Sequence, residues 1–437
     1  MPPDSTSPPG RPTRPLLAGV LLSLAVAAAV LHAFWPAFPR LVSGLAGWGA
    51  GLLLWPGLPV RTRRQVLALL AVGVAGLAWG WSRGVAPDLA WALSANAALI
   101  AMLAAVSFLR LVSDPGGEGA RTLPTGPRAL GSTLLGVHLF GAVINLSTVF
   151  IMGDRLERSR GLERRAVMVL VRGFAAAAHW SPFFAAMAAA LTFAPGAQLQ
   201  PLMAVGVPLA AVALLMTLYD ARRVGGEPFT GYPMNLRGLW LPGLLAAAVL
   251  AAHAFAPALP VLGIITLFAP ALALGVMLLR GREGRVLLAR HVGGNLPRMG
   301  NELALFLAAG VMAAGLGSVF AALGGWVPFT GYGVMEAGIT LAVMVAIALV
   351  GVHPVIGVAA FGTLLAPLHP DPNLLAMTFL AAWSLGVSSS PFSGMNLALQ
   401  GRYGVPALDF LRWNLFYSVR MIAVTVAAMA VYVALRG

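Results

Sequence analysis

The chain has 437 residues, of which 59% are hydrophobic and only 10% are charged, and its mean hydropathy is +0.86. These values lie far outside the range of soluble globular proteins. Cysteine is absent, which excludes disulfides, iron–sulfur clusters and thiol catalysis. The formal charge of +14 comes from arginines that lie mostly in short loops between apolar runs, and the positive-inside rule explains them better than nucleic-acid binding does.

Residues 1–14 are rich in proline and serine and predict a short disordered cytoplasmic tail. The apolar run 15–34 is longer than the core of about 7–15 residues found in a cleaved signal peptide. It therefore predicts an uncleaved first membrane helix, and a signal peptide ending near Ala33 is the alternative.

Further apolar runs of about 17–25 residues recur along almost the whole length, as membrane-spanning helices require. The loops and turn residues that flank each run predict that it forms a single helix, either continuous or broken. The expected spans lie near residues 41–58, 66–82, 89–110, 166–194, 201–219, 239–255, 259–279, 301–323, 372–400 and 411–435.

Two more apolar stretches, 129–152 and 334–368, do not fit as simple crossings. The segment 154–165 holds five arginines and the loop 110–128 holds three, so a crossing at 129–152 would place one basic loop outside. A re-entrant hairpin at each stretch keeps the basic loops, including residues 280–298, on the cytoplasmic side. The charge pattern thus predicts an all-helical membrane protein of the plasma or inner membrane with about eleven crossings and two opposed hairpins. Its N-terminus is cytoplasmic and its C-terminus is outside.

The tripeptide Ser-Pro-Phe occurs twice in apolar surroundings, at Ser181-Pro182-Phe183 and, 209 residues later, at Ser390-Pro391-Phe392. Proline breaks or kinks a membrane helix, and the freed backbone is tolerated only where protein or a water-filled cavity satisfies it. The expected hairpin tips, Asn145-Leu146-Ser147-Thr148 and Gly351-Val352-His353-Pro354, recur at nearly the same spacing, 206 residues apart. Paired breaks of this kind predict inverted repeats that surround a central binding site.

This order of helices, hairpin, broken helix and helix, followed by the same order inverted, resembles the ion transporter superfamily over about residues 40–435. Within it, the chain is most similar to the divalent-anion/sodium symporters. The segment Ser390–Asn396 is similar to the second helix break of those symporters, and Asn145–Thr148 to their Ser-Asn-Thr hairpin tip. The resemblance implies scaffold helices at 15–128 and 223–323 that dimerise. A transport core at 129–222 and 324–437 would slide past them as an elevator.

Small hydroxyl and amide oxygens gather at the expected tips and breaks. Such oxygens suit a weakly held alkali cation, and they can hydrogen-bond a carboxylate without adding fixed charge. The alternative is that they only satisfy backbone groups freed by the proline kinks. The predicted solute and cation site comprises Asn145, Ser147, Thr148, Ser181, Pro182, His353, Pro354, Ser388, Ser389, Ser390, Pro391, Ser393 and Asn396.

Four further polar residues lie within or at the ends of apolar stretches. His179, Glu302 and Glu336 are candidates for a gate or for proton coupling, because their charge can change and intramembrane carboxylates are costly. The alternatives are a hydrogen-bonded structural histidine, and capping or snorkelling by the two glutamates. Arg172, six residues into its expected helix, is expected to snorkel to the cytoplasmic surface, and the alternative is that it offsets the charge of the substrate.

The sequence therefore predicts a secondary active transporter for a small anion, an organic acid or oxyanion, driven by sodium or protons. Both breaks lack acidic residues, so a bound carboxylate would meet no fixed negative charge. A sodium/proton antiporter is the alternative, and it would be expected to use a deeply placed carboxylate. A channel fits the paired breaks less well, and an intramembrane enzyme is disfavoured because no His-Glu-x-x-His motif or cysteine is present.

No cofactor or resident metal is expected, and only the coupling cation, sodium or proton, is left open. The expected partners are the anionic solute, membrane lipids and a second copy of the chain in a homodimer, with no nucleic acid.

Overall fold

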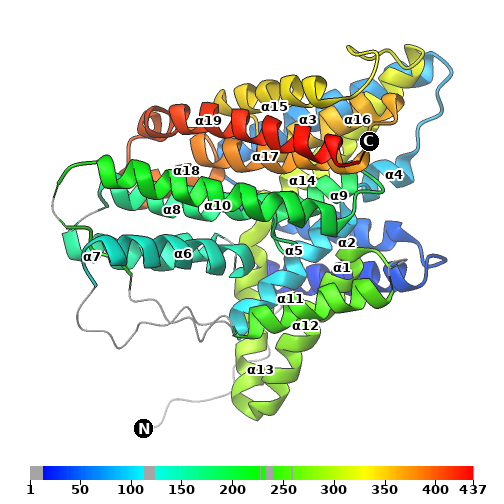
Figure 1. Cartoon of the computed structure of the whole chain (residues 1–437). Helices are drawn as coiled ribbons and strands as arrows, with labels where there is room; N and C mark the ends of the chain where they lie inside the picture. The colour runs from blue at the N-terminus through cyan, green and yellow to red at the C-terminus, as the bar shows by residue number, and fades with distance from the viewer. Residues whose placement is uncertain are drawn as a thin grey trace, which may run out of the picture.

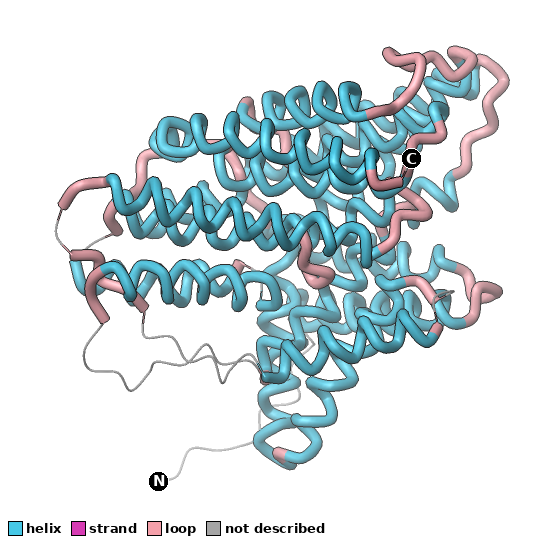
Figure 2. Tube along the Cα trace, in the orientation of Figure 1, coloured by secondary structure: helices cyan, strands magenta, loops and turns pink. Residues whose placement is uncertain are grey.

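A computed structural model describes residues 13–112, 124–144, 146–160, 162–226, 228–232, 240–256 and 259–436. These residues are almost entirely helical and form no β-strand, only one isolated bridge between Thr125 and Thr230. The expected N-terminal tail, apart from its last two residues, lies outside the described ranges. Most loops gather at two opposite ends of the molecule (Figure 2).

Within the described residues, eight helical runs are long and apolar enough to cross a membrane. Large apolar side chains also lie on the outer surface: Phe255 and Leu279 are each 90% exposed, which suits contact with lipid tails. The chain is therefore an integral membrane protein. The eight runs are Arg14–Phe34, Val60–Ser82, Leu89–Leu111, Leu199–Arg223, Val261–Leu279, Gly281–Ala322, Pro372–Tyr403 and Ala407–Ala434.

In the N-terminal part, α1 packs against α2 and runs antiparallel to it, whereas α3 packs against the distant α14 and runs parallel to it. Prolines stand at the turns, where a missing N–H costs least: Pro39 precedes α2 and Pro59 precedes α3. The elements are α1 (Arg14–Phe34), α2 (Arg40–Leu54), η1 (Trp55–Gly57), α3 (Val60–Ser82), α4 (Leu89–Ser94), α5 (Ala97–Ser107) and η2 (Phe108–Leu111).

The middle of the chain contains one prediction that is wrong: the basic segment 280–298, expected as a loop, is helical. Gly281, at φ +58, makes the corner after α12, and the winding then changes to π and 3-10 near Pro297, which lacks an N–H donor. This series of helical turns continues directly into the next membrane span. Its elements are α11 (Trp240–Phe255), α12 (Val261–Leu279), α13 (Gly281–Arg290), the π-helix η5 (His291–Asn295), η6 (Leu296–Met299) and α14 (Gly300–Ala322).

Helices α3 and α14 cross with their backbones in contact. A Cβ atom added at Gly315 would lie 2.2 Å from the carbonyl oxygen of Gly73, and one added at Gly76 would lie 2.6 Å from that of Gly315. Small residues at such a crossing are what lets two membrane helices approach this closely.

Gly315→Ala is therefore expected to destabilise the protein by about 1–3 kcal/mol, because the added methyl forces the two helices apart. The matched control is Gly275→Ala in α12, where an added Cβ meets nothing within 4 Å. Thermal unfolding of the two variants in detergent checks this. Equal melting temperatures would contradict the close crossing.

The remaining helices form two series with the same order. The first is α6 (Pro127–Ile144), α7 (Ser147–Arg160), α8 (Arg164–Ala176) with η3 (Ala177–His179), α9 (Ala185–Phe193) and α10 (Leu199–Arg223). The second is α15 (Val334–Leu349), α16 (Pro354–Leu365) with η7 (Ala366–Leu368), α17 (Pro372–Ser389), α18 (Gly394–Tyr403) and α19 (Ala407–Ala434). Figure 1 shows α10 and α19, the last helix of each series, side by side and running in opposite directions.

Each series begins with two helices that pack against one another, α6 with α7 and α15 with α16. The C-terminal part of α7 lies beside the end of α18, where Asp154 pairs with Arg402 at 2.5 Å. The corner after α16 instead lies beside the C-terminus, where Asp371 pairs with Arg436. The two helical pairs therefore end at opposite ends of the molecule (Figure 1).

Candidate functional site

The two proline breaks are built in the same way. Ser181, between η3 and α9, donates its hydroxyl to the carbonyl oxygen of Ala142 in α6 at 2.5 Å. Ser390, between α17 and α18, donates to the carbonyl oxygen of Ala348 in α15 at 2.6 Å. Each serine therefore ties its break to the first helix of the preceding helical pair.

The same two serines also close the local turns. The Ser181 hydroxyl accepts the N–H of Phe183, and the Ser390 hydroxyl accepts the N–H of Phe392, each at 3.2 Å. A side-chain oxygen that accepts an N–H two residues on is the usual way for serine to stabilise a turn. The recurrence seen in the sequence thus corresponds to a recurrence of individual hydrogen bonds.

The two broken helices cross at equivalent residues. Ser384 in α17 donates its hydroxyl to the carbonyl oxygen of Ala175 in α8 at 2.8 Å, and these residues are 209 positions apart, the same offset as the two breaks. The two helices therefore contact each other at positions that correspond by the repeat spacing. Each break follows six residues later on its own helix.

At the second break, most predicted site residues satisfy the end of α17. The Asn396 side-chain amide donates to three backbone carbonyls at 2.9–3.3 Å. Ser393 donates to one of the same carbonyls and accepts the Asn396 N–H, while Ser389 shares a 2.6 Å hydrogen bond with Ser418. Ser388 donates within its own helix. The Asn396 Oδ1 atom is buried without a hydrogen-bond partner and is the group left over for a ligand.

An ion network around the buried Arg172 supports this second break. Arg172 is 1% exposed, so the expectation that it snorkels to the surface is wrong. Its guanidinium donates to Asp220 of α10 at 2.7 Å and to the Asn414 side-chain oxygen of α19 at 2.7 Å. Asn414 in turn donates to the carbonyl of Ser388 at 3.1 Å, and Arg420 donates to Asp220 at 2.6 Å. The first broken helix is thereby linked to the end of the second.

Around the first break the polar groups are less fully bonded. Thr148 Oγ1 and His179 Nε2 are both buried without a hydrogen-bond partner. Trp180 donates its indole N–H to His138 at 3.0 Å, and His138 also bonds the Gly173 carbonyl at 3.1 Å. Pro182 follows Ser181 in the turn. Asn145 and the Ser147 side chain fall outside the described part of the chain.

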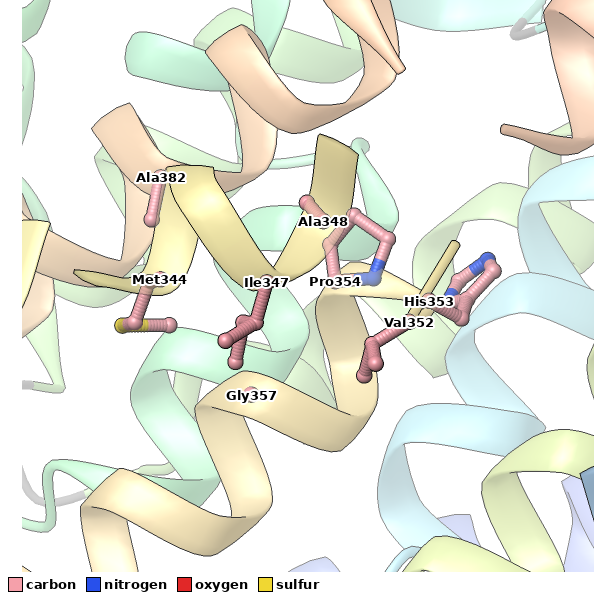
Figure 3. Close-up of a pocket in the computed structure, with 8 residues that line it drawn as sticks. All are labelled: Met344, Ile347, Ala348, Val352, His353, Pro354, Gly357 and Ala382. Carbon is pink, nitrogen blue, oxygen red and sulfur yellow. The ribbon is translucent and has the colours of Figure 1, made fainter. Parts of the chain in front are cut away.

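The tip of the second helical pair is closed. His353 accepts the N–H of Val355 at 3.3 Å and so caps α16, with Pro354 as its first residue (Figure 3). Trp383 stands edge-on to the His353 ring, 5.7 Å between centroids. The space between these residues and Met344 is too small for a water molecule.

Helix α3 covers the same tip from the N-terminal part. Gln65 donates its side-chain amide to the Gly351 carbonyl at 3.1 Å. Arg61 stacks on the ring of Phe392, 4.7 Å from its centroid, so this helix contacts both the second tip and the second break.

By contrast, the first tip opens on a cavity of about 390 Å³. Leu146 at the tip, Phe150 of α7 and Ala185 at the start of α9 line one part of it. The other lining residues come from α5, η2, η5, η6 and α14, and those with polar side chains are Ser107, Arg110, Asn295, Arg298 and Glu302. Glu302, which the sequence predicts as a candidate for a gate or for proton coupling, therefore lies in this cavity. Glu336 instead accepts the Gly333 N–H at 2.8 Å and caps α15.

Sequence reasoning missed the two cavity arginines, because both were assigned to basic loops. The only local signal was the segment Gly293-Gly294-Asn295-Leu296-Pro297 before Arg298, a run of helix-disturbing residues next to a span.

No protein-family model matches the chain, and no curated protein matches it. Among solved structures, the chain is similar to the crystal structure of the Alcanivorax borkumensis YdaH transporter, described there as having an unusual topology. The match covers 86% of this chain and 90% of that chain, with 15% sequence identity and a TM-score of 0.43.

Proposed function

We propose that this protein is a secondary active transporter that moves a small anion across the membrane, driven by sodium or protons. The observation that carries the proposal is the pair of proline breaks, each tied by the same serine hydrogen bonds to the preceding helical pair. Two equivalent interruptions in the middle of apolar helices are typical of transporters, where they flank the solute.

In this proposal, the pairs α6–α7 and α15–α16 are re-entrant hairpins that enter the membrane from opposite faces, with the N-terminus cytoplasmic and the C-terminus outside. Residues 129–222 and 324–437 form the core that moves. The other helices form a scaffold that dimerises, and the core slides past it as an elevator. The breaks and tips predicted from the sequence hold the solute and cation in the core, with the free Asn396 Oδ1 atom as one cation ligand.

The charge of the first cavity favours an anion as the solute. It is lined by two arginines, Arg110 and Arg298, and one carboxylate, Glu302. The positive N-terminal end of α9 also reaches it at Ala185. The antiporter alternative would need a deep carboxylate free to exchange its ion. Asp220 is held by two guanidinium groups, which leaves Glu302 of this cavity as the candidate for that role.

Uptake into proteoliposomes tests the proposal. Radiolabelled benzoate, succinate and phosphate would be offered under an inward sodium gradient, under an inward proton gradient and under neither. Accumulation of at least one anion above its outside concentration is expected under one gradient only, and an ionophore for that cation should abolish it. Sodium/proton exchange in the absence of any anion would contradict anion transport and support the antiporter.

A further inference from the structure

We propose that the cavity at the first tip binds an organic monocarboxylate, with its carboxylate between Arg110 and Arg298 and its apolar body against Leu103, Leu146 and Phe150. The inference rests on the proposed function and names the solute class. The two guanidinium groups come from residues that the sequence did not predict to hold the solute.

Among the described residues, the two cavity arginines have no ion-pair partner, unlike the buried Arg172 of α8. Among the described residues, neither Arg110 nor Arg298 forms an ion pair or a side-chain hydrogen bond, whereas Arg172 is bonded to Asp220. Their like charges repel each other, and both side chains are exposed to solvent. A carboxylate between them would replace this repulsion by two charge-assisted hydrogen bonds, the strongest kind that arginine makes.

The fold brings the two arginines to the same cavity. Arg110 is in η2 and Arg298 is in η6, which follows the π-helix η5. His291 of that π-helix shares a 3.0 Å hydrogen bond with Ser107, and its ring lies 4.6 Å from that of Phe108, measured between centroids. These contacts fasten η2 to the π-helix. A π-turn inside an otherwise regular helix is frequent at functional sites, because it redirects side chains at a cost in helix stability.

The size and charge of the cavity define the class of ligand. Its volume of about 390 Å³ is within the range of small-molecule sites, and most of its lining is apolar. Two arginines and one glutamate sum to a formal charge of +1, which matches a monoanion better than a dianion. A carboxylate with a ring or a short alkyl chain satisfies both conditions, whereas an inorganic oxyanion leaves the apolar wall without a partner.

The cavity is formed by two parts of the chain that the proposed function sets in relative motion. The arginines belong to the scaffold, while Leu146, Phe150 and Ala185 belong to the core. The site is complete only when the core stands in the present position against the scaffold. It is therefore a capture or release site of one conformational state rather than a site that travels with the core.

Isothermal titration of the purified full-length protein with benzoate, acetate and sulfate tests this assignment. Benzoate is expected to bind more tightly than acetate, and sulfate most weakly. Arg110→Gln and Arg298→Gln should each weaken benzoate binding about 10- to 150-fold, the effect of losing a hydrogen bond to a charged group. Leu103→Ala should weaken benzoate more than acetate. Arg290→Gln, on the exposed side of α13, is the matched control and should leave binding unchanged.

Unchanged benzoate affinity in both cavity variants would overturn the assignment, as would absence of binding to the wild type or a preference for sulfate. Melting temperatures equal to wild type would show that the exposed arginines are not needed for folding. Uptake measurements distinguish the failure of the cavity assignment from the failure of the proposed transport function. If the wild type transports an anion and both variants keep its KM, the cavity assignment fails and the transporter stands. If the variants lose benzoate binding but the wild type transports nothing, the transporter fails and the binding site stands.

Discussion

Asp220→Asn is expected to destabilise the folded protein by about 3–5 kcal/mol, because it removes the carboxylate that compensates two guanidinium groups. Arg172, 1% exposed, would be left as a buried charge without its ion-pair partner, and Arg420 would lose the same carboxylate. The loss should extend to the second break, because Arg172 also holds Asn414, which bonds the Ser388 carbonyl.

The matched control for this change is Asp154→Asn. Asp154 also pairs with an arginine, Arg402, but the two side chains are 31% and 52% exposed. A surface ion pair contributes only about 0–1 kcal/mol. Chemical unfolding of both variants in detergent measures the difference, and equal losses would show that the Arg172 network contributes no more than an exposed pair.

Ser181→Ala and Ser390→Ala are each expected to lower the initial rate of anion uptake by about 10-fold or more, with folded protein recovered in both cases. Each change removes the hydroxyl that ties a break to the preceding helical pair and leaves the buried carbonyl of Ala142 or Ala348 with one partner fewer. A lost hydrogen bond of this kind costs about 1–3 kcal/mol. Because the two geometries match, the two variants should resemble each other.

Thr192→Ala in α9 and Thr363→Ala in α16 serve as controls within the same two series of helices. Their hydroxyls donate to the carbonyls of Ala188 and Ala359, four residues earlier in the same helix, so no hydrogen bond between helices is lost. Proteoliposome uptake, with size-exclusion profiles to verify folding, compares the four variants. If the threonine variants lose as much uptake as the serine variants, or if only one serine variant is impaired, the paired role of the breaks is contradicted.

The positions of the breaks could be predicted from the sequence because their cause is local. Pro182 and Pro391 have no N–H to donate, which weakens the helix at each point, and the surrounding apolar residues place each interruption inside a span. Proline alone is not sufficient, because Pro208 and Pro270 lie inside continuous helices. The repeated spacing added a second, independent signal. The membrane class follows from composition, since chains this apolar do not remain soluble, and the apolar runs of about 17–25 residues predict that the spans are helices.

The arrangement of charged side chains could not be predicted, because it depends on contacts between distant segments. Arg172 is buried only because Asp220 and Asn414, from two other helices, meet its guanidinium. Arg110 and Arg298 line one cavity because the segment before Arg298 is wound as a π-helix. The many arginines of that segment are instead typical of a loop. The charge count of that segment predicted its side of the membrane but carried no information about its winding.

The hydrogen bond between Ser384 and Ala175 joins the same place in the two halves of the chain. In the proposed elevator, Ala175 and Ser384 both belong to the core, so this hydrogen bond joins two parts that travel together. We therefore expect the bond to persist in every conformational state. The crossing of α8 and α17 would then keep the two halves of the core together while the core moves.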